Sequence, residues 1–143
     1  MSIQTFKQHR TWLVTAALLA TVAGVFVART AFARVTFNTI DPVARVSDQG
    51  RHLTVTGPLA FTAGETAYLR VTVTQRATGA VAEGDAVLSG TGTTNQWQVL
   101  ATAQGKPVFA PGPAEAVGLA VTTTRGTTTD AHQWLVQITL ANE

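Results

Sequence analysis

The chain of 143 residues contains no cysteine. This absence excludes disulfide bonds, thiolate metal sites, a cysteine nucleophile and a lipid-modified cysteine. Serine is almost as scarce, because Ser47 and Ser89 are the only serines after Ser2. Neither lies in a Gly-x-Ser-x-Gly or Ser-x-x-Lys motif, so the sequence gives no sign of a serine nucleophile. A domain of about 110 residues can bury enough apolar surface to fold without disulfides.

Acidic residues are absent from the first 33 positions. That segment carries three basic residues, whereas residues 34–143 carry seven basic and eight acidic residues. The net charge of +2 and the isoelectric point of about 9.7 therefore come from the first segment. Nucleic-acid binding needs basic residues clustered on the folded part of a protein. The charge distribution thus predicts no nucleic-acid partner.

The first segment has the layout of a secretory signal. Lys7 and Arg10 precede 18 uncharged residues (11–28), and the segment ends in the Ala-x-Ala pattern Ala31-Phe32-Ala33. A positive start, an apolar stretch and small residues before the cut are typical of a signal peptide. The pattern predicts cleavage after Ala33.

The same apolar stretch also fits an uncleaved membrane anchor. Its length is close to the ~20 residues that cross a bilayer, and Arg29 separates it from the Ala-x-Ala pattern. A helix buried in the folded domain is a third interpretation. Positive charge before the stretch keeps the N-terminus in the cytoplasm in both leading interpretations. We therefore expect an exported protein, periplasmic or extracellular, in which residues 1–33 are a signal peptide or an apolar helix anchored in the inner (cytoplasmic) membrane and residues 34–143 form the folded domain.

Alternation of apolar and polar residues dominates from residue 34 onward. Period-2 alternation gives a strand one buried and one solvated face, as in antiparallel sheets. Turns that contain glycine or proline separate the alternating runs. The runs predicted as strands are Val35–Ile40, Val43–Val46, His52–Phe61, Thr66–Thr74, Asp85–Ser89, Gln96–Ala103, Ala116–Thr124 and Trp134–Leu140. Seven or eight short strands indicate a β-sandwich or a small barrel, and we expect a single antiparallel β-sandwich.

Two tryptophans, Trp97 and Trp134, stand at inward positions of these runs. Each follows a turn that contains Gly-Thr-Thr, at residues 92–94 and 126–128. We interpret both tryptophans as core anchors. The shared pattern indicates two hairpins of similar geometry, because an internal duplication would show more matched positions.

The segment Ala63-Gly64-Glu65-Thr66-Ala67-Tyr68-Leu69-Arg70-Val71-Thr72-Val73-Thr74 is similar to the turn and strand of many bacterial immunoglobulin-like domains. The likeness covers 12 of about 110 residues. It implies a domain that is immunoglobulin-like in general architecture. It carries no functional residue with it, because a fold does not define a function.

Three residues are candidate metal ligands. Asp130 lies two positions before His132, so both side chains point to one face of an extended strand, and His52 is the other histidine of the folded domain. A metal site usually needs three or four ligands, and the sequence shows no local cluster of that size. The alternative interpretation is that Asp130 binds backbone amides at the end of a hairpin.

The pair Glu83 and Asp85 could act as an acid and a base, or bind calcium together with Asp48. The glycines near this pair favour solvated turn residues instead. We therefore predict no catalytic residue and no cofactor.

Two places are candidates for partner contacts. Tyr68 and Arg70 lie on the polar face of a predicted strand, where the tyrosine ring would be exposed. Val108 and Phe109 lie in the proline-rich segment of residues 106–113, which either docks back on the core or contacts a partner.

The function expected from the sequence is that of an exported, non-enzymatic β-sandwich protein that serves interaction or assembly in the cell envelope. Its partner would be an envelope protein or a glycan, with membrane contact through residues 11–28 if they are retained. One alternative is a periplasmic protein that binds a small ligand or a metal with Asp130 and His132. A third is a hydrolase with a site assembled from distant loops. The sequence leaves the oligomeric state open.

Overall fold

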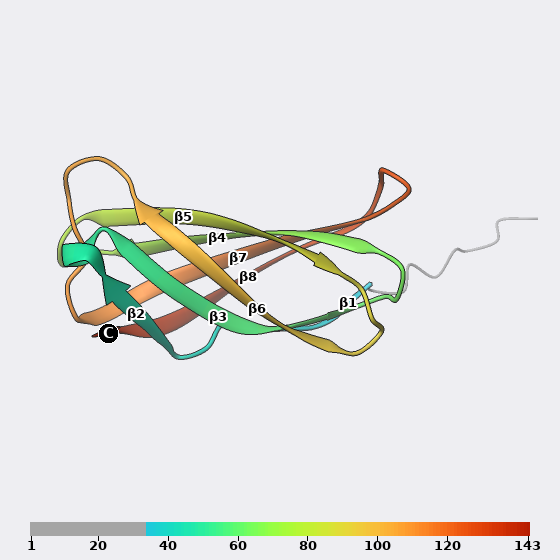
Figure 1. Cartoon of the computed structure of the whole chain (residues 1–143), viewed down its shortest axis with the longest axis horizontal. Coiled ribbons are helices and arrows are strands. Elements are labelled where there is room, and N and C mark those ends of the chain that lie inside the picture. The colour runs from blue at the N-terminus through green and yellow to red at the C-terminus, as the bar shows by residue number, and fades with distance from the viewer. Residues whose placement is uncertain (1–33) are drawn as a thin grey trace, which may run out of the picture. The chain divides into compact units, whose positions relative to one another are not determined.

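The structure is a computed structural model that describes residues 34–143 (Figure 1). The apolar helix and the cleavage site expected in residues 1–33 lie outside the described residues. The elements are β1 (Val35–Asn38), β2 (Val43–Ser47), a short 3-10 turn η1 (Asp48–Gly50), β3 (His52–Phe61), β4 (Thr66–Gln75), β5 (Ala80–Ser89), β6 (Thr94–Ala103), β7 (Gly112–Thr124) and β8 (Thr127–Asn142). The prediction of an all-β domain is confirmed.

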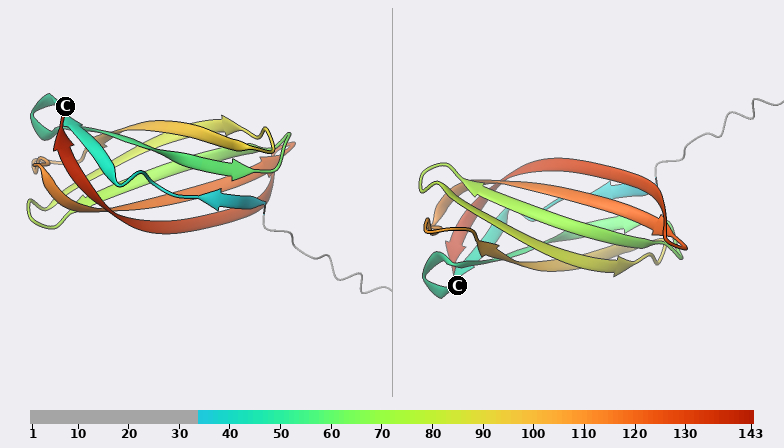
Figure 2. Two further views of the ribbon diagram at one scale, coloured as in Figure 1. Left: turned by 90° about the horizontal axis from the view of Figure 1, so that it is seen from below. Right: turned by 90° about the horizontal axis from the view of Figure 1, so that it is seen from above.

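The strands form one sheet in the order β1-β3-β2-β8-β7-β4-β5-β6, and β3 also pairs with β6. This second pairing closes strands β2 to β8 into a seven-stranded barrel, with β1 lying beside β3. The expected open sandwich is therefore wrong. The physical reason is that β3 offers one edge to β6 along nearly its whole length and the other edge to β1 and β2. Figure 2 shows the closed ring of strands from two sides.

One pair of strands departs from the expected antiparallel arrangement. β2 runs parallel to β8, over the pairs from Val43↔Thr139 to Val46↔Asn142. All other pairings of the sheet are antiparallel. A parallel pair cannot be joined by a tight turn, and here the remaining strands of the barrel form the connection. The first and last strands of the barrel thus meet at a seam.

The two ends of the barrel carry different connections (Figures 1 and 2). At what we call the β1 end, the start of β1 lies near the β3–β4, β5–β6 and β7–β8 turns. At the η1 end, η1 lies near the β4–β5 turn and the β6–β7 loop. Within residues 34–143, no helix is long and apolar enough to cross a membrane.

On β3, β4, β6 and β8 the side chains that alternation predicted to point inward fill the interior of the barrel. On β3 these include Leu53, Val55, Leu59 and Phe61, all of them buried. On β7 the predicted apolar set, Val117, Leu119 and Val121, faces outward instead, because Ala116, Gly118 and Ala120 take the inward positions. β5 and β7 supply small side chains, and the buried alanines of the core are Ala44, Ala67, Ala80, Ala82, Ala101, Ala103, Ala114, Ala116 and Ala120. A barrel of seven strands encloses a narrow space. Small residues on several walls leave room for the large ones on β3.

Both tryptophans lie across a glycine of the neighbouring strand. Trp97 is opposite Gly57 and Trp134 is opposite Gly118. A Cβ atom at Gly57 would lie 2.6 Å from Cζ2 of Trp97, and one at Gly118 would lie 2.5 Å from Cζ2 of Trp134. Each indole therefore occupies the space that a side chain would need. Trp97 is buried, as predicted, whereas Trp134 is partly buried and packs against the core.

The expectation of two similar hairpins is wrong for the first turn. β7 and β8 form a true hairpin that pairs from Gly112↔Leu140 to Thr124↔Thr127. β5 and β6 pair only at Ala82↔Ala103 and Glu83↔Thr102, far from their turn. β6 leaves β5 because its pairing with β3 closes the barrel.

We predict that Gly118→Ala destabilises the barrel by about 1–3 kcal/mol, because the new methyl group would overlap the Trp134 ring. Urea denaturation of the single variants and of the Gly118→Ala/Trp134→Ala double variant measures the coupling between the two positions. We expect Gly118→Ala to cost much less when Trp134 is absent. An equal cost in both backgrounds would contradict the packing explanation.

Candidate functional site

The three candidate metal ligands lie at opposite ends of the barrel. His52 begins β3 at the η1 end, where it pairs with Ser47 and Thr102. Asp130 accepts hydrogen bonds next to the other end of β3, close to Val35. Nine residue steps of β3 separate these ends, about 30 Å at a rise of 3.3 Å per residue. Residues 34–143 contain no group of three or more His, Cys, Asp or Glu residues that could hold a metal ion. His52 therefore does not complete a site with Asp130 and His132.

Asp130 instead holds the start of β1 against β8. Its Oδ2 accepts hydrogen bonds from the backbone N–H groups of Arg34, at 3.1 Å, and Val35, at 3.2 Å. Its Oδ1 accepts one from the N–H of Ala131 at 2.9 Å. β1 pairs with β3 in the sheet, and β2 pairs with β8 only at the opposite end. A side-chain carboxylate thus joins the two strands where the parallel ladder does not extend. The interpretation of Asp130 as an acceptor for backbone amides describes these contacts.

A β-bulge precedes Asp130 on β8. The register of β7 and β8 shifts between Thr122 and Thr123, so that Thr129 is the extra residue of β8. The hydroxyl groups of Thr122 and Thr129 are 2.9 Å apart and hydrogen-bonded. Bulges bend a strand and re-aim its side chains. The bulge at Thr129 directly precedes Asp130, whose side chain points toward the start of β1.

His132 packs against an aromatic ring. The imidazole stacks on the indole of Trp134, with ring centroids 6.1 Å apart and an interplanar angle of 26°. It lies on the same side of β8 as Asp130, as alternation predicted, opposite Ala120 of β7. The His132 side chain is exposed, so this stack lies at the surface of the barrel.

The local contacts lower the pKa of Asp130. Partial burial by itself raises the pKa, but the backbone N–H groups of Val35, Arg34 and Ala131 together outweigh it, with a smaller contribution from the charge of His132. Donors that favour the charged form of a carboxylate lower its pKa. Asp130 is therefore a carboxylate at neutral pH.

A second carboxylate, Glu65, lies at the same end of the barrel and is buried, with a side chain 2 % exposed. Glu65 was not among the candidate residues named from the sequence. Its Oε1 accepts hydrogen bonds from the Arg34 guanidinium and from the Thr124 hydroxyl, the latter at 3.1 Å. Its Oε2 is buried and has no hydrogen-bond partner among the described residues. A buried charge of this kind requires a cation as partner, and Arg34 is that cation.

The turn that carries Glu65 is fixed by the neighbouring β5–β6 turn. Gly64 donates to the carbonyl oxygen of Gly90 at 3.0 Å, and Gly90 donates back to that of Glu65 at 2.8 Å. Gly64 has a φ of 79°, a conformation that favours glycine. The only sequence signal for Glu65 is its place beside this glycine, which does not distinguish a buried acid from an exposed one.

The proline-rich loop between β6 and β7 docks back on the core. Phe109 is buried, and its backbone N–H bonds to the carbonyl of Gly50 at 3.0 Å. The buried Gln75 amide holds Ala110 from both sides, through bonds of 2.8 and 3.0 Å. Of the two candidates for partner contact in this loop, Phe109 is therefore part of the core and only Val108 remains at the surface.

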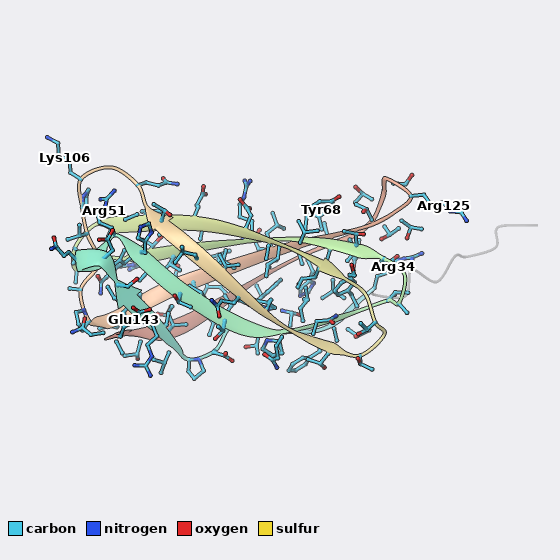
Figure 3. The ribbon with its side chains drawn as sticks, in the orientation of Figure 1. Arg34, Arg51, Tyr68, Lys106, Arg125 and Glu143 are labelled. Atoms are coloured by element: carbon cyan, nitrogen blue, oxygen red, sulfur yellow. The ribbon has the colours of Figure 1, made fainter. Side chains whose placement is uncertain are left out.

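The other pair of candidates lies on the outer wall of the barrel. Tyr68 and Arg70 are exposed on β4, with the Tyr68 side chain pointing away from the barrel in Figure 3. They line a hollow of about 340 Å³. Exposed or partly exposed apolar side chains of β5 and β7 line it or lie next to it, and Leu135 of β8 extends this surface through its pairing with Val117. We call this surface the outer apolar face, and it consists of Tyr68, Val87, Val117, Leu119, Val121 and Leu135.

Register brings the outer apolar face together. Tyr68 is opposite Val87 on one side and Val121 on the other, and Leu135 is opposite Val117. Sequence reasoning missed Val87, Leu119 and Leu135. The available signal was that apolar residues also occupy the outward positions of these runs.

The acids of β5 are strand residues, so their prediction as turn residues is wrong. Glu83 and Asp85 lie on the outward side of β5, where Asp85 accepts a hydrogen bond from Arg70 Nε at 3.0 Å. This bond and the charges of Asp85 and Glu83 raise the pKa of Arg70 above its ordinary value, against a small opposing effect of burial. Asp48 lies at the η1 end, where its Oδ2 is 3.4 Å from Nε2 of His52. The structure therefore does not bring Asp48 together with the other two acids.

We predict that Asp130→Asn lowers the free energy of unfolding by about 1–2 kcal/mol at neutral pH, because hydrogen bonds to a charged acceptor are weakened. The pKa of Asp130 is lower in the folded chain, so its contribution is complete above the unfolded value of about 4. The contribution is lost as the pH falls through the folded-state pKa. Urea denaturation from pH 7 to pH 2 should show the two chains converging below about pH 4. The exposed Glu143→Gln is the matched control, and a difference that stays constant with pH would contradict the assignment.

Comparison with known proteins finds no matching family model and no matching curated protein. No residue role is therefore transferred to this chain from a relative. The function is inferred below from the sequence and from the geometry of residues 34–143.

Proposed function

We propose that the chain is an exported, non-enzymatic binding protein of the cell envelope, and that it contacts a partner protein through the outer apolar face. The observation that carries this proposal is the gathering of exposed apolar side chains from β4, β5, β7 and β8 on one wall of the barrel. Val87 is 65 % exposed, Leu135 55 % and Tyr68 52 %. Contiguous apolar surface of this kind marks interaction sites on soluble domains.

The proposal of export is supported by the first segment of the sequence. The charge before residues 11–28, the apolar stretch itself and the Ala-x-Ala pattern are the features of a secreted or membrane-anchored chain. The barrel would then be displayed on the outer side of the cytoplasmic membrane, with or without its N-terminal helix.

The closed barrel favours contact through a face of the sheet. A partner strand can add to a sheet only where an edge is free. Here β3, β4 and β7 are paired on both sides, whereas β5 and β6 leave their facing edges free beyond Ala82↔Ala103 and Glu83↔Thr102. The strands β4 and β7, which carry Tyr68, Leu119 and Val121, therefore offer a partner their outward side chains and not their edges.

The chemistry of the outer apolar face favours a protein over a glycan. A sugar-binding platform usually has several exposed aromatic rings, and this face has Tyr68 alone, because Trp97 and Trp134 pack over glycines in the barrel. The charges within the hollow, Arg70 and Asp85, are paired with each other. A complementary partner would present an apolar surface of low net charge, with tyrosine as the natural anchor on this side.

The immunoglobulin-like likeness belongs to the same proposal. It falls on the β3–β4 turn and on β4, the strand that carries Tyr68 and Arg70. A general immunoglobulin-like architecture would suit a displayed binding module, and its two-sheet form is replaced here by a closed barrel.

The test uses a photo-crosslinking amino acid at position 87 in cells that export the full chain, followed by mass spectrometry of the product. We expect crosslinks to one envelope protein. A photo-crosslinker at Leu100, which is 58 % exposed on β6, is the matched control and should give no such product. Equal crosslinking from both positions, crosslinking only to a second copy of the chain, or capture of glycan alone would contradict the proposal.

Affinity for the identified partner gives the second measurement. Tyr68→Ala should weaken binding about tenfold or more, because truncation of a central aromatic contact costs at least ~1.4 kcal/mol. Leu135→Ser should weaken it as well, whereas Leu100→Ser, at almost the same exposure, should leave it unchanged. Thermal unfolding of each variant separates loss of binding from loss of fold.

A further inference from the structure

Arg34, the first described residue, lies between two carboxylates that come from distant parts of the chain. Its guanidinium pairs with Glu65 of the β3–β4 turn, and its backbone nitrogen lies 3.1 Å from Oδ2 of Asp130 on β8. Figure 3 places Arg34 at the β1 end of the barrel. These partners are 31 and 96 positions away in sequence. The fold thus directs two acidic groups at a single residue.

The same residue directly follows the Ala-x-Ala pattern of residues 31–33. Hydrolysis of the peptide bond between Ala33 and Arg34 consumes one water molecule. It leaves a carboxylate on Ala33 and an amino group on Arg34. A free α-amino group has a pKa of about 7.7–8.0, so much of it takes up a proton at neutral pH. The nitrogen that now faces Asp130 as an amide would then be an ammonium group.

We propose that the β1 end is a receptor for the N-terminal arginine released by cleavage after Ala33, in which Asp130 binds the new α-ammonium group and Glu65 binds the guanidinium. This inference rests on the export step of the proposed function. It names a processing site and the residues that bind its product.

The charges at this end support the proposal. In the uncut chain, residue 34 brings one positive charge to two carboxylates. After cleavage Arg34 carries two positive charges, on its α-ammonium and guanidinium groups, one for each of the two carboxylates. Glu65 is almost fully buried and its Oε2 has no partner among the described residues. An ammonium group close to this end therefore adds a positive charge beside a buried carboxylate that is only partly paired within residues 34–143.

The geometry also keeps the nitrogen of Arg34 in place after cleavage. Val35 donates its own N–H to the same Oδ2 of Asp130, at 3.2 Å, and pairs with Phe61 of β3. Thr124 holds Glu65 from the β7–β8 hairpin. His132 is the other titratable group that acts on Asp130. None of these contacts involves a residue before Arg34.

The consequence is that removal of the first segment stabilises the barrel. The contact between the start of β1 and β8 depends on Asp130. A charged donor strengthens a hydrogen bond to a carboxylate. The exported chain would therefore reach its full stability only after processing.

The first experiment identifies the mature N-terminus. The full chain is expressed in a bacterium, and the envelope and soluble fractions are analysed by intact mass and N-terminal sequencing. We expect a chain that begins at Arg34. A chain that is cut at another bond or that keeps residues 1–33 would overturn the inference.

The second experiment measures the coupling between cleavage and Asp130. Thermal unfolding is compared for processed chain and for the Ala33→Leu variant, whose larger side chain should block the cut, in the same detergent and with or without Asp130→Asn. We expect Asp130→Asn to lower the melting temperature by about 5–10 °C in the processed chain and by less than half as much in the uncut chain. The exposed Glu143→Gln should act equally on both forms. An equal effect of Asp130→Asn on both would overturn the inference.

A third measurement needs no variant that must fold. The rate at which an amine-reactive ester modifies the α-amino group of the processed chain at pH 7 is compared with the rate in urea. An α-ammonium bound to Asp130 should react about tenfold more slowly in the folded chain, and equal rates would overturn the proposal.

The outcomes separate this inference from the proposed function. A chain that is exported uncut and still crosslinks its partner through position 87 would refute the arginine receptor alone. A processed chain that begins at Arg34 and crosslinks nothing would refute the partner-binding function alone.

Discussion

The seam between β2 and β8, the first and last strands of the barrel, is the constraint on which the rest of the structure depends. β2 and β8 close the barrel by a parallel ladder of only four residue pairs, from Val43↔Thr139 to Val46↔Asn142. Beyond it, β1 lies beside β3, and the carboxylate of Asp130 joins it to β8 through two backbone amides. A short ladder and one side chain thus hold together segments that are about 96 residues apart in the sequence. Charge-assisted hydrogen bonds are among the stronger polar contacts, which suits this position.

Closure also decides how the interior is packed. A seven-stranded ring leaves little space, so β5 and β7 carry mainly alanine and glycine on the inside, where other strands carry large residues. The two tryptophans fit because each faces a glycine across its strand pair. With both indoles used in this way, Tyr68 is the exposed aromatic side chain of the outer apolar face. The outer apolar face and the core are therefore both affected by the narrow interior.

The sequence supported part of the candidate site. Alternation correctly put Asp130 and His132 on one face of a strand, and the interpretation of Asp130 as an acceptor for backbone amides describes its contacts. It also placed Tyr68 and Arg70 at the surface. Glu65 and its partner Arg34 were not recognised, because an isolated acid beside a glycine gives no sign of burial. Val87 and Leu135 were missed since an apolar residue on the outward side of a strand has no local signature of partner contact.

The sequence by itself determined most of the strands, the inward faces of β3, β4, β6 and β8, and the turns between them, because period-2 alternation and glycine conformations are local properties of the chain. On β7 it did not, because alanine and glycine face inward there and the larger apolar residues face outward. It could not determine whether those strands form two layers or a ring, since the alternation is the same in both. That choice depends on which edges pair over long distances, here β3 with β6 and β2 with β8. The tertiary structure alone brought Arg34 to Glu65 and Asp130, because contacts between residues 31 and 96 positions apart follow from closure of the barrel and not from any neighbouring residue.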